Sequence, residues 1–366
     1  MRILVVGTGA VGSLLGWALA DAGEAVTVVR RSAQASDRST APVSETRGSI
    51  TIRRPDGSGS TAAVGVVGAI DAAAHTAQPP EVILVAVRQH DLAGVLRDLA
   101  VLPDAVLMTV QNGIGAEDAA IAARPGGRLL AASLTASVDL DATGSVGWLR
   151  RGGIGLAPVA PGAGVPEAPP DDPGTREAAA VGRRLVSAFE ASGLPARWLE
   201  DARAMKWSKL IANLVGNATS ALLDMDPVAV YRDTRLATIE LDQLREALRV
   251  MDALGLSVVD LPGAPVRWLA RAVRLPNPVA RIALRRIVGG ARGGKDPSLR
   301  IVLAGGGPTE VAWLNGAVAG AAEGVGLEAP VNAALARLVD EAAIDAGRRM
   351  WFVHRPERLV DAVRQE

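Results

Sequence analysis

The chain has 366 residues, with 39 basic and 39 acidic side chains. This length predicts two domains with enough interior for a proper core, and the balanced charge argues against nucleic acid or an anionic membrane surface as a partner. The absence of cysteine excludes disulfides, thiolate metal sites and a cysteine nucleophile, and it suits a reducing cytoplasm. The three histidines are far apart in sequence, so no metal site is expected, and no stretch is apolar enough to predict a membrane span.

The chain opens with an apolar run over residues 1–6, which predicts a buried parallel strand. A glycine-rich turn follows, then a helical pattern over residues 13–22 and a second strand pattern over residues 25–29. This context makes the GxGxxG match indicative of dinucleotide binding. An ordinary glycine-rich turn is the simpler alternative. Residues 3–20 also resemble a signal peptide, but their glycines and short basic region argue against that interpretation.

The three glycines of the turn have separate roles in this interpretation. The first allows the tight turn, the second lets the backbone approach a pyrophosphate, and the third lets the helix pack on the strand. The helix N-terminus then offers N–H groups and a partial positive charge to the phosphates. We therefore predict a Rossmann-type domain whose cofactor contacts include Gly7, Thr8, Gly9, Ala10, Val11 and Gly12.

The end of the second strand indicates which dinucleotide is bound. NAD enzymes usually place an acidic side chain there to hold the ribose hydroxyls, whereas this strand runs into Arg30 and Arg31. Two guanidinium groups suit a 2′-phosphate. The sequence therefore favours NADPH over NADH, and the alternative is that both are ordinary surface arginines.

Residues 33–47 are predicted to form a loop. The stretches 48–52 and 61–67 flank a turn signal at residues 55–59 and predict an inserted hairpin.

Two further buried strands are expected at residues 82–87 and 105–110, with a helix over residues 92–99 between them. Arg88 follows the first of these strands and Asn112 the second. Ligands bind outside the carboxyl ends of the strands in a doubly wound sheet. Arg88 is therefore predicted to contact the cofactor, and Asn112 the nicotinamide or the substrate unless it belongs to a simple turn.

Residues 128–158 alternate in character and should complete the sheet. A stretch rich in proline and glycine over residues 158–174 predicts a flexible loop. A helix over residues 177–191 and a short strand over residues 194–199 are expected next.

From residue 201 the pattern is helical almost throughout, which marks a change of domain. We predict a Rossmann-type NADPH-binding domain over residues 1–200 and an all-helical substrate domain over residues 201–366.

A polar row interrupts the helix predicted over residues 203–223. Lys209, Asn213 and Asn217 are four residues apart and therefore share one face, over roughly 12 Å of helix. A cation and two carboxamides in apolar surroundings need partners, since their desolvation is costly. The row is either a polar stripe that lines solvent or a domain interface, or a substrate-facing row with the lysine as acid.

The rest of the second half is predicted to be helical, with one or two helices over residues 228–255. Residues 262–295 mix arginines with apolar side chains. They predict an exposed amphipathic helical pair in preference to a membrane-surface helix or a partner face. A further helix is expected to open at Glu310, where an acidic side chain suits the helix dipole.

Several motifs together resemble the ketopantoate reductase (2-dehydropantoate 2-reductase) family. They are Gly7-Thr-Gly-Ala-Val-Gly12, Gln111-Asn-Gly-Ile-Gly115, Trp207-Ser-Lys-Leu-Ile-Ala-Asn213 with Asn217, and Ser298 followed by Pro308-Thr-Glu-Val-Ala-Trp-Leu-Asn-Gly316. The resemblance covers nearly the whole chain. It implies an N-terminal Rossmann domain and a C-terminal helical domain, with the active site between them.

The resemblance also implies roles for individual residues. Lys209 would be the general acid that protonates the ketone oxygen as hydride arrives, with Glu310 near the lysine and the cofactor. Substrate contacts would come from Asn112, Asn213, Asn217 and Ser298. Asn112 would also touch the cofactor, and Arg31 would meet the 2′-phosphate. A charged lysine can stabilise a developing alkoxide and then supply the proton.

The chain departs from the family pattern at three places near the expected site. Arg88 stands where the family commonly has lysine, residues 218–220 read Ala-Thr-Ser instead of Pro-Leu-Thr, and an acidic residue after Ser298 is missing. The preferred prediction is NADPH-dependent reduction of 2-dehydropantoate to (R)-pantoate, on the pathway to coenzyme A. A reductase of another 2-keto acid or ketone and a non-catalytic nucleotide-binding protein are the alternatives. A homodimer is left open.

Overall fold

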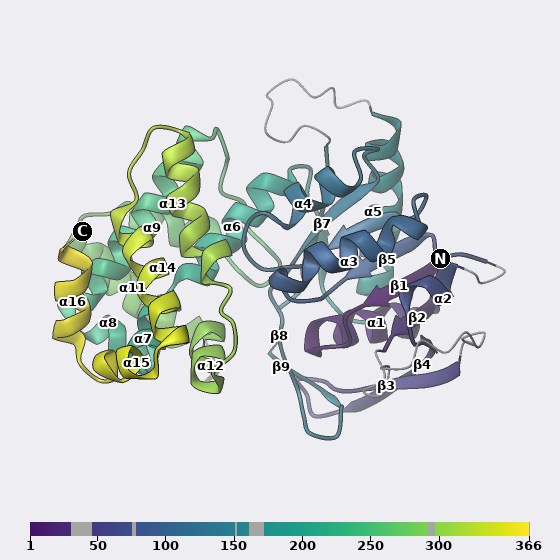
Figure 1. Ribbon diagram of the computed structural model, residues 1–366, viewed down its shortest axis with the longest axis horizontal. Helices are drawn as coiled ribbons and strands as arrows, with labels where there is room; N and C mark the ends of the chain where they lie inside the picture. Colours follow the sequence, from purple (N-terminus) through teal and green to yellow (C-terminus); the bar gives the residue numbers. More distant parts are fainter. Residues whose placement is uncertain (31–45, 75–77, 151, 161–171, 292–296, 366) are drawn as a thin grey trace. The chain divides into compact units, whose positions relative to one another are not determined.

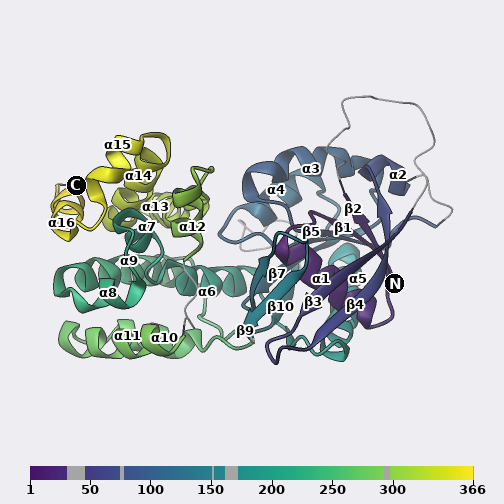
Figure 2. The same ribbon diagram turned by 90° about the horizontal axis from the view of Figure 1, so that it is seen from below.

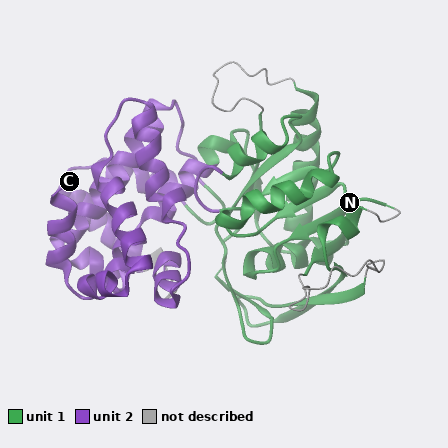
Figure 3. Ribbon diagram, viewed as in Figure 1, with its two compact units in different colours: residues 1–111, 116–205, 261–264 green, residues 112–115, 206–260, 265–366 purple. Residues whose placement is uncertain are grey.

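The computed structural model describes residues 1–30, 46–74, 78–150, 152–160, 172–291 and 297–365. These residues form two compact units (Figure 3). The first comprises residues 1–111, 116–205 and 261–264, and the second comprises residues 112–115, 206–260 and 265–366.

The first unit is built on one sheet whose centre is parallel. Its six parallel strands lie in the order β4-β2-β1-β5-β6-β7, which is the doubly wound order of a Rossmann fold. Their bounds are β1 (Arg2–Val6), β2 (Ala25–Val29), β4 (Gly59–Val67), β5 (Val82–Val85), β6 (Val106–Thr109) and β7 (Leu129–Leu134). The central strands are continuous apolar runs because both faces of the sheet are covered.

Five more described strands extend the sheet at its two sides. The strands β3 (Thr46–Arg53), β9 (Val146–Arg150) and β8 (Ser137–Leu140) continue beyond β4, and β10 (Ile154–Val159) and β11 (Ala196–Trp198) continue beyond β7. This confirms that residues 128–158 complete the sheet.

Helices cover both faces of this sheet, as Figure 2 shows. One face carries α1 (Ala10–Asp21) and α5 (Pro173–Ala191), which pack against each other. The other carries α2 (Ile70–Ala74), α3 (Leu92–Asp98) and α4 (Ala116–Ala123), with the short 3₁₀ turns η1 (Gln89–Asp91) and η2 (Leu99–Val101) beside α3. The apolar helix α1 is almost wholly buried, with Trp17 fully enclosed.

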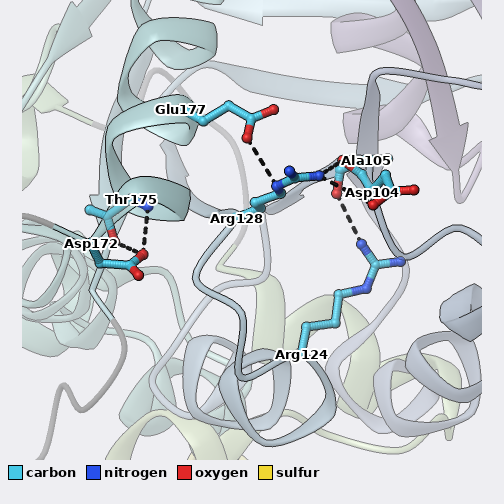
Figure 4. Close-up of polar contacts among 7 residues, drawn as sticks. All are labelled: Asp104, Ala105, Arg124, Arg128, Asp172, Thr175 and Glu177. Carbon is cyan, nitrogen blue, oxygen red and sulfur yellow. Dashed lines mark hydrogen bonds and ion pairs between the residues drawn. The ribbon is translucent and has the colours of Figure 1, made fainter.

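Two arginines tie together the edge of the sheet where β6 and β7 begin (Figure 4). Arg124 donates from Nη1 to the carbonyl of Ala105 at 3.0 Å, and its Nη2 reaches two further carbonyls at the end of α3 and η2. Arg128 bonds the carbonyl of Asp104 at 2.7 Å and pairs with Glu177 of α5 at 2.9 Å. Burial lowers the pKa of the Arg124 guanidinium from its ordinary value. These contacts are at the amino ends of the strands, so we assign them to stability.

The second unit is built from helices (Figure 1). In the described residues they pack around α9 (Thr234–Ala253), which contacts α8, α10, α11, α13, α14 and α16. The bounds are α6 (Ala202–Leu214), α7 (Ala218–Leu223), α8 (Pro227–Arg232), α10 (Val266–Val273), α11 (Asn277–Ala291), α12 (Ser298–Gly305), η3 (Val311–Trp313), α13 (Asn315–Gly324), α14 (Pro330–Ile344), α15 (Ala346–Phe352) and α16 (Pro356–Arg364). None of the described helices is both long and apolar enough to cross a membrane.

The predicted amphipathic pair is confirmed as α10 and α11. Trp268, Val279 and Ile282 are about half exposed, whereas the opposite faces of both helices are buried. Arg274 pairs with Asp252 of α9 at 2.7 Å, so part of the basic charge serves packing within the unit.

Several predicted elements need correction. The stretch 61–67 is not part of an insertion, because β4 pairs in parallel with β2 and is a central strand of the sheet. The helices α1 and α5 begin a few residues earlier than predicted, α5 because Asp172 accepts the Thr175 N–H as an N-cap. The helix over residues 203–223 is broken, and no α-helix opens at Glu310.

Other predictions are confirmed or lie outside the described residues. The strands at residues 1–6 and 25–29, the helix at residues 92–99 and the strands at 82–87 and 105–110 are confirmed to within about two residues. Most of the loop at residues 33–47 and residues 161–171 of the loop at 158–174 are outside the described residues.

Candidate functional site

The glycine turn after β1 has the geometry that each glycine was predicted to supply. Gly7 has a φ of +105°, and a Cβ there would lie 2.7 Å from the backbone of Ala86 at the end of β5. A Cβ on Gly12 would lie 1.9 Å from the carbonyl oxygen of Gly7. A Cβ on Gly9 would meet nothing within 4 Å, so the backbone there faces open space. Only the second glycine is therefore open to an approaching ligand, as a pyrophosphate requires.

The start of α1 complements this opening. The N–H groups in the first turn of any helix have no partner within the helix. The N-cap residue of α1 is Gly9, which has no side chain to bond them, and no acidic side chain stands in the first turn. The turn is also internally braced, since Ser13 donates from Oγ to the carbonyl of Thr8 at 3.2 Å. The residues present therefore fit the diphosphate of a dinucleotide.

Basic side chains follow two of the neighbouring strands. Arg30 follows β2, is exposed, and donates its N–H to the carbonyl of Val67 at 3.0 Å. Arg88 is exposed at the start of η1, after β5. Arg31 lies outside the described residues. The carboxyl edge of the sheet thus carries Arg30 and Arg88 near the open glycine turn.

Gln111 braces the same edge, and the sequence analysis missed it as a site residue. Its side chain is buried, and Nε2 donates to the carbonyls of Val85 at 3.0 Å and Val87 at 3.1 Å. The ends of β5 and β6 are thereby joined. The available signal was a polar side chain directly after an apolar strand, which needs a hydrogen-bond partner if it is buried.

The loop after β6, residues 112–115, belongs to the helical unit and brings predicted site residues together. Asn213 of α6 donates from Nδ2 to Oδ1 of Asn112 at 3.3 Å. Lys209 is one helical turn before Asn213 on the same face and is partly exposed. These three polar side chains therefore form one cluster at the exposed side of α6.

The same loop also rests on the segment that carries Glu310. Ile114 donates its N–H to the carbonyl of Trp313 at 3.0 Å. Trp313 ends η3, the 3₁₀ turn that follows Glu310, and Glu310 is the residue before its first turn. The predicted helix at Glu310 is therefore wrong. This segment is a single tight turn before α13, because Trp313 and Leu314 donate to carbonyls three residues back.

The polar row does not continue on one helix to Asn217, which corrects the prediction. The helix α6 ends at Leu214, and Gly216 has a φ of +57°. Asn217 is buried at the start of α7, where its Oδ1 accepts the N–H of Leu299 at 3.2 Å. Asn217 therefore lies beside Ser298, the exposed first residue of α12, and one of its polar atoms already serves that helix.

The break in α6 is held by a buried carboxylate that the sequence analysis did not single out. Glu240 of α9 is fully buried and accepts hydrogen bonds from the Gly216 N–H at 2.6 Å, Thr219 Oγ1 at 2.5 Å and Tyr231 Oη at 2.6 Å. The signal was a glutamate at four-residue spacing between Leu236 and Leu244, in the buried stripe of an amphipathic helix.

A second buried network holds the far end of η3. Asn315, the first residue of α13, donates from Nδ2 to Gln243 Oε1 and Asn332 Oδ1, both at 2.9 Å. Asn332 in turn donates to Glu246 of α9 at 2.7 Å. Burial raises the pKa of Glu246, and its hydrogen bonds from Asn332 and Val331 oppose that effect. The segment after Glu310 is therefore fixed to the centre of the helical unit.

Both halves of the chain match family models of known proteins. Residues 3–161 match the family described as Ketopantoate reductase PanE/ApbA, and residues 201–343 match the description Ketopantoate reductase PanE/ApbA C terminal. The chain belongs to the ketopantoate reductase family. It is thus an oxidoreductase of the ketopantoate reductase kind, and the resemblance seen in its motifs is confirmed.

Individual relatives agree with this family. The 2-dehydropantoate 2-reductase of Halobacterium salinarum is 28% identical over 342 residues, which cover 93% of this chain and 98% of that protein. Among solved structures, a PanE/ApbA family ketopantoate reductase from Ralstonia eutropha JMP134 aligns with a TM-score of 0.70 at 21% identity, covering 94% and 99% of the two chains.

A D-mandelate dehydrogenase in a ternary structure with NADH and anilino(oxo)acetate also aligns, with a TM-score of 0.70 at 17% identity and coverage of 94% and 99%. At these identities the two structural likenesses establish the fold. The predicted α/β class, a Rossmann-type domain followed by an all-α domain, is confirmed.

Proposed function

We propose that this protein is an NADPH-dependent 2-dehydropantoate 2-reductase, which reduces ketopantoate to (R)-pantoate in pantothenate and coenzyme A biosynthesis. The observation that carries the proposal is the polar cluster of Lys209 and Asn213 on α6 with Asn112, whose loop also rests on the turn after Glu310. A reductase of this family needs an acid and hydrogen-bond donors at the keto acid, and these side chains supply both.

We assign cofactor binding and substrate chemistry to different halves of the chain. We assign dinucleotide binding to residues 1–200 and substrate chemistry to residues 201–366, with Asn112 as a contributor from the first half. Gly7, Thr8, Gly9, Ala10, Val11 and Gly12 would hold the diphosphate at the start of α1. When bound, the dinucleotide supplies a hydride to the carbonyl carbon of the keto acid.

The remaining step is a proton transfer by the chain itself. As hydride adds to the carbonyl carbon, negative charge develops on the oxygen, and the Lys209 ammonium stabilises it and then donates its proton to give the hydroxyl. Glu310 would favour the charged form of the lysine before the reaction. Asn112 and Asn213 would orient the keto acid, and Ser298 and Asn217 would contact its other end.

Arg30 and Arg31 support NADPH as the dinucleotide, since β2 ends without an acidic side chain. We expect Arg31→Ala to raise the Kd for NADPH by about 10- to 100-fold, because a charge-assisted contact to the 2′-phosphate is worth about 1.5–3 kcal/mol. The Kd for NADH should change little. Titration of each dinucleotide by fluorescence measures both values.

Arg97→Ala, an arginine in the last turn of α3, is the control for a general loss of positive charge. It should leave both affinities unchanged. Equal weakening of NADPH and NADH binding in Arg31→Ala would remove that arginine from 2′-phosphate recognition.

Reduction of a different 2-keto acid is the second candidate. One observation that favours it is Thr219, which lies in the altered Ala-Thr-Ser run and donates a hydrogen bond from Oγ1 to Glu240 at 2.5 Å. The other is Arg88, which stands in place of the family's usual lysine. Different residues next to Asn217 would change which side chain of the keto acid the site accepts, while the reaction type would stay the same.

Oxidation of NADPH, followed by its absorbance, tests these possibilities with ketopantoate and a panel of 2-keto acids of different side-chain size. Rapid oxidation with ketopantoate alone is the expected result. Activity only with other members of the panel would favour the second candidate. Intact NADPH binding with no turnover of any substrate would indicate a non-catalytic nucleotide-binding protein and would refute both reductase proposals.

A further inference from the structure

The loop at residues 112–115 is shaped by a main-chain contact with Trp313. A Cβ built on Gly113 would lie 2.2 Å from the Trp313 carbonyl oxygen and 2.9 Å from its carbonyl carbon, so the backbone of Trp313 fills the space where any side chain would go. Gly113 also has a φ of +85°, which disfavours other residues. The next residue, Ile114, donates its N–H to the same carbonyl at 3.0 Å. The loop therefore rests on the main-chain carbonyl group of Trp313, which we call the seat of the loop.

The seat itself is held firmly within the helical unit. Trp313 donates its N–H to the carbonyl of Glu310 at 3.1 Å, and Val311 between them is fully buried. Asn315, two residues further on, is fixed by buried hydrogen bonds to Gln243 and Asn332. A carbonyl oxygen in this segment can move little without breaking that network.

Asn112 directly precedes Gly113, so the path of the backbone at the seat sets where its carboxamide points. That carboxamide accepts a hydrogen bond from Asn213, 101 positions later in the chain, at 3.3 Å. We propose that Gly113 and the main-chain carbonyl of Trp313 are positioning groups that aim the Asn112 carboxamide at the keto acid, beside Asn213 and Lys209. This inference rests on the proposed function of Asn112 in substrate binding.

Gly113→Ala tests the proposal, because the added methyl group must displace the loop from Trp313. A misplacement of about 1 Å in a positioning group can cost about 100-fold. We expect kcat/KM for the preferred keto acid to fall by about that factor, while the Kd of the dinucleotide changes less than about threefold. Steady-state kinetics and fluorescence titration give the two values.

Gly144→Ala is the matched control. Gly144 has nearly the same backbone conformation, with a φ of +82°, but a Cβ there would meet nothing within 4 Å. It therefore reproduces the backbone strain without the clash, and its kcat/KM should equal that of the unaltered protein. A comparable loss of activity in Gly144→Ala would attribute the effect of Gly113→Ala to strain and overturn the proposal.

A double-mutant cycle separates positioning from a general structural role. If Gly113 acts through Asn112, then Gly113→Ala should cost nothing further in an Asn112→Ala background. Additive losses would overturn the inference while leaving Asn112 in the site. Unaltered kcat/KM in Asn112→Ala alone would instead remove Asn112 from substrate binding and overturn this inference, while the measured turnover would leave the reductase proposal standing.

Hydrogen exchange in the unaltered protein tests the seat without any substitution. The Ile114 amide should exchange slowly, like other amides bonded within the helical unit. Exchange as fast as that of an exposed loop would show that the bond to Trp313 does not hold the loop, even if Gly113→Ala fails to fold.

Discussion

Replacing Lys209 with alanine should lower kcat by about 1000-fold while the dinucleotide still binds with unchanged affinity. General acid catalysis by a positioned side chain contributes about 100- to 10,000-fold, and the ammonium group would also stabilise the alkoxide. The lysine stands on α6, outside the glycine turn, so its removal should spare dinucleotide binding. Single-turnover kinetics and a fluorescence titration separate the two effects.

Lys209→Arg is the informative control for this experiment. Arginine keeps the positive charge but does not release its proton at neutral pH, so it tests charge and proton donation separately. We expect a kcat between those of the alanine variant and the unaltered protein. An alanine variant with unaltered kcat would exclude Lys209 as the acid, and the mechanism would then need another proton donor.

Glu240→Ala should lower the free energy of unfolding by about 3–5 kcal/mol, the loss typical of breaking a buried charged network. It leaves the Gly216 N–H and the hydroxyls of Thr219 and Tyr231 without their shared acceptor in a buried place. Because these bonds hold the break between α6 and α7, activity should fall as well. Urea denaturation followed by circular dichroism measures the stability.

Glu240→Gln is the matched variant, since its carboxamide has nearly the same shape. Its oxygen can still accept the Gly216 N–H, and its NH₂ group can donate to hydroxyls, which also accept hydrogen bonds. We therefore expect a loss of about 1 kcal/mol, in line with a typical net hydrogen-bond contribution. If the alanine variant unfolds at the same urea concentration as the unaltered protein, Glu240 does not hold the break.

Much of the first unit could be predicted because its signals are local. The apolar run of β1, the glycine turn and the pattern of α1 are each read within a few residues. Within the turn, Gly7 is required by its positive φ, and Gly12 by its close contact with the carbonyl oxygen of Gly7. The adjacency of Lys209 and Asn213 is equally local, since one turn of a helix separates them. The family resemblance rested on the same short motifs.

Two failures of prediction share a physical cause, which is a partner distant in sequence. The strand β4 was taken for part of an insertion because its pairing with β2 leaves no mark within β4 itself. The helix over residues 203–223 was predicted as continuous because its apolar pattern continues through Gly216. The helix α6 ends at Leu214, and in the break that follows the Gly216 N–H is bonded by a carboxylate from α9, 24 residues later.

By itself the sequence determined the fold class, the dinucleotide turn and the identity of the lysine–asparagine pair, because backbone sterics and side-chain periodicity act between near neighbours. Only the tertiary structure decided that Asn112 meets Asn213, that Asn217 lies against α12, and that Gly113 sits on the Trp313 carbonyl. Each of these contacts joins segments more than 80 residues apart. Their geometry is set by the packing of whole helices, which no short stretch of sequence specifies.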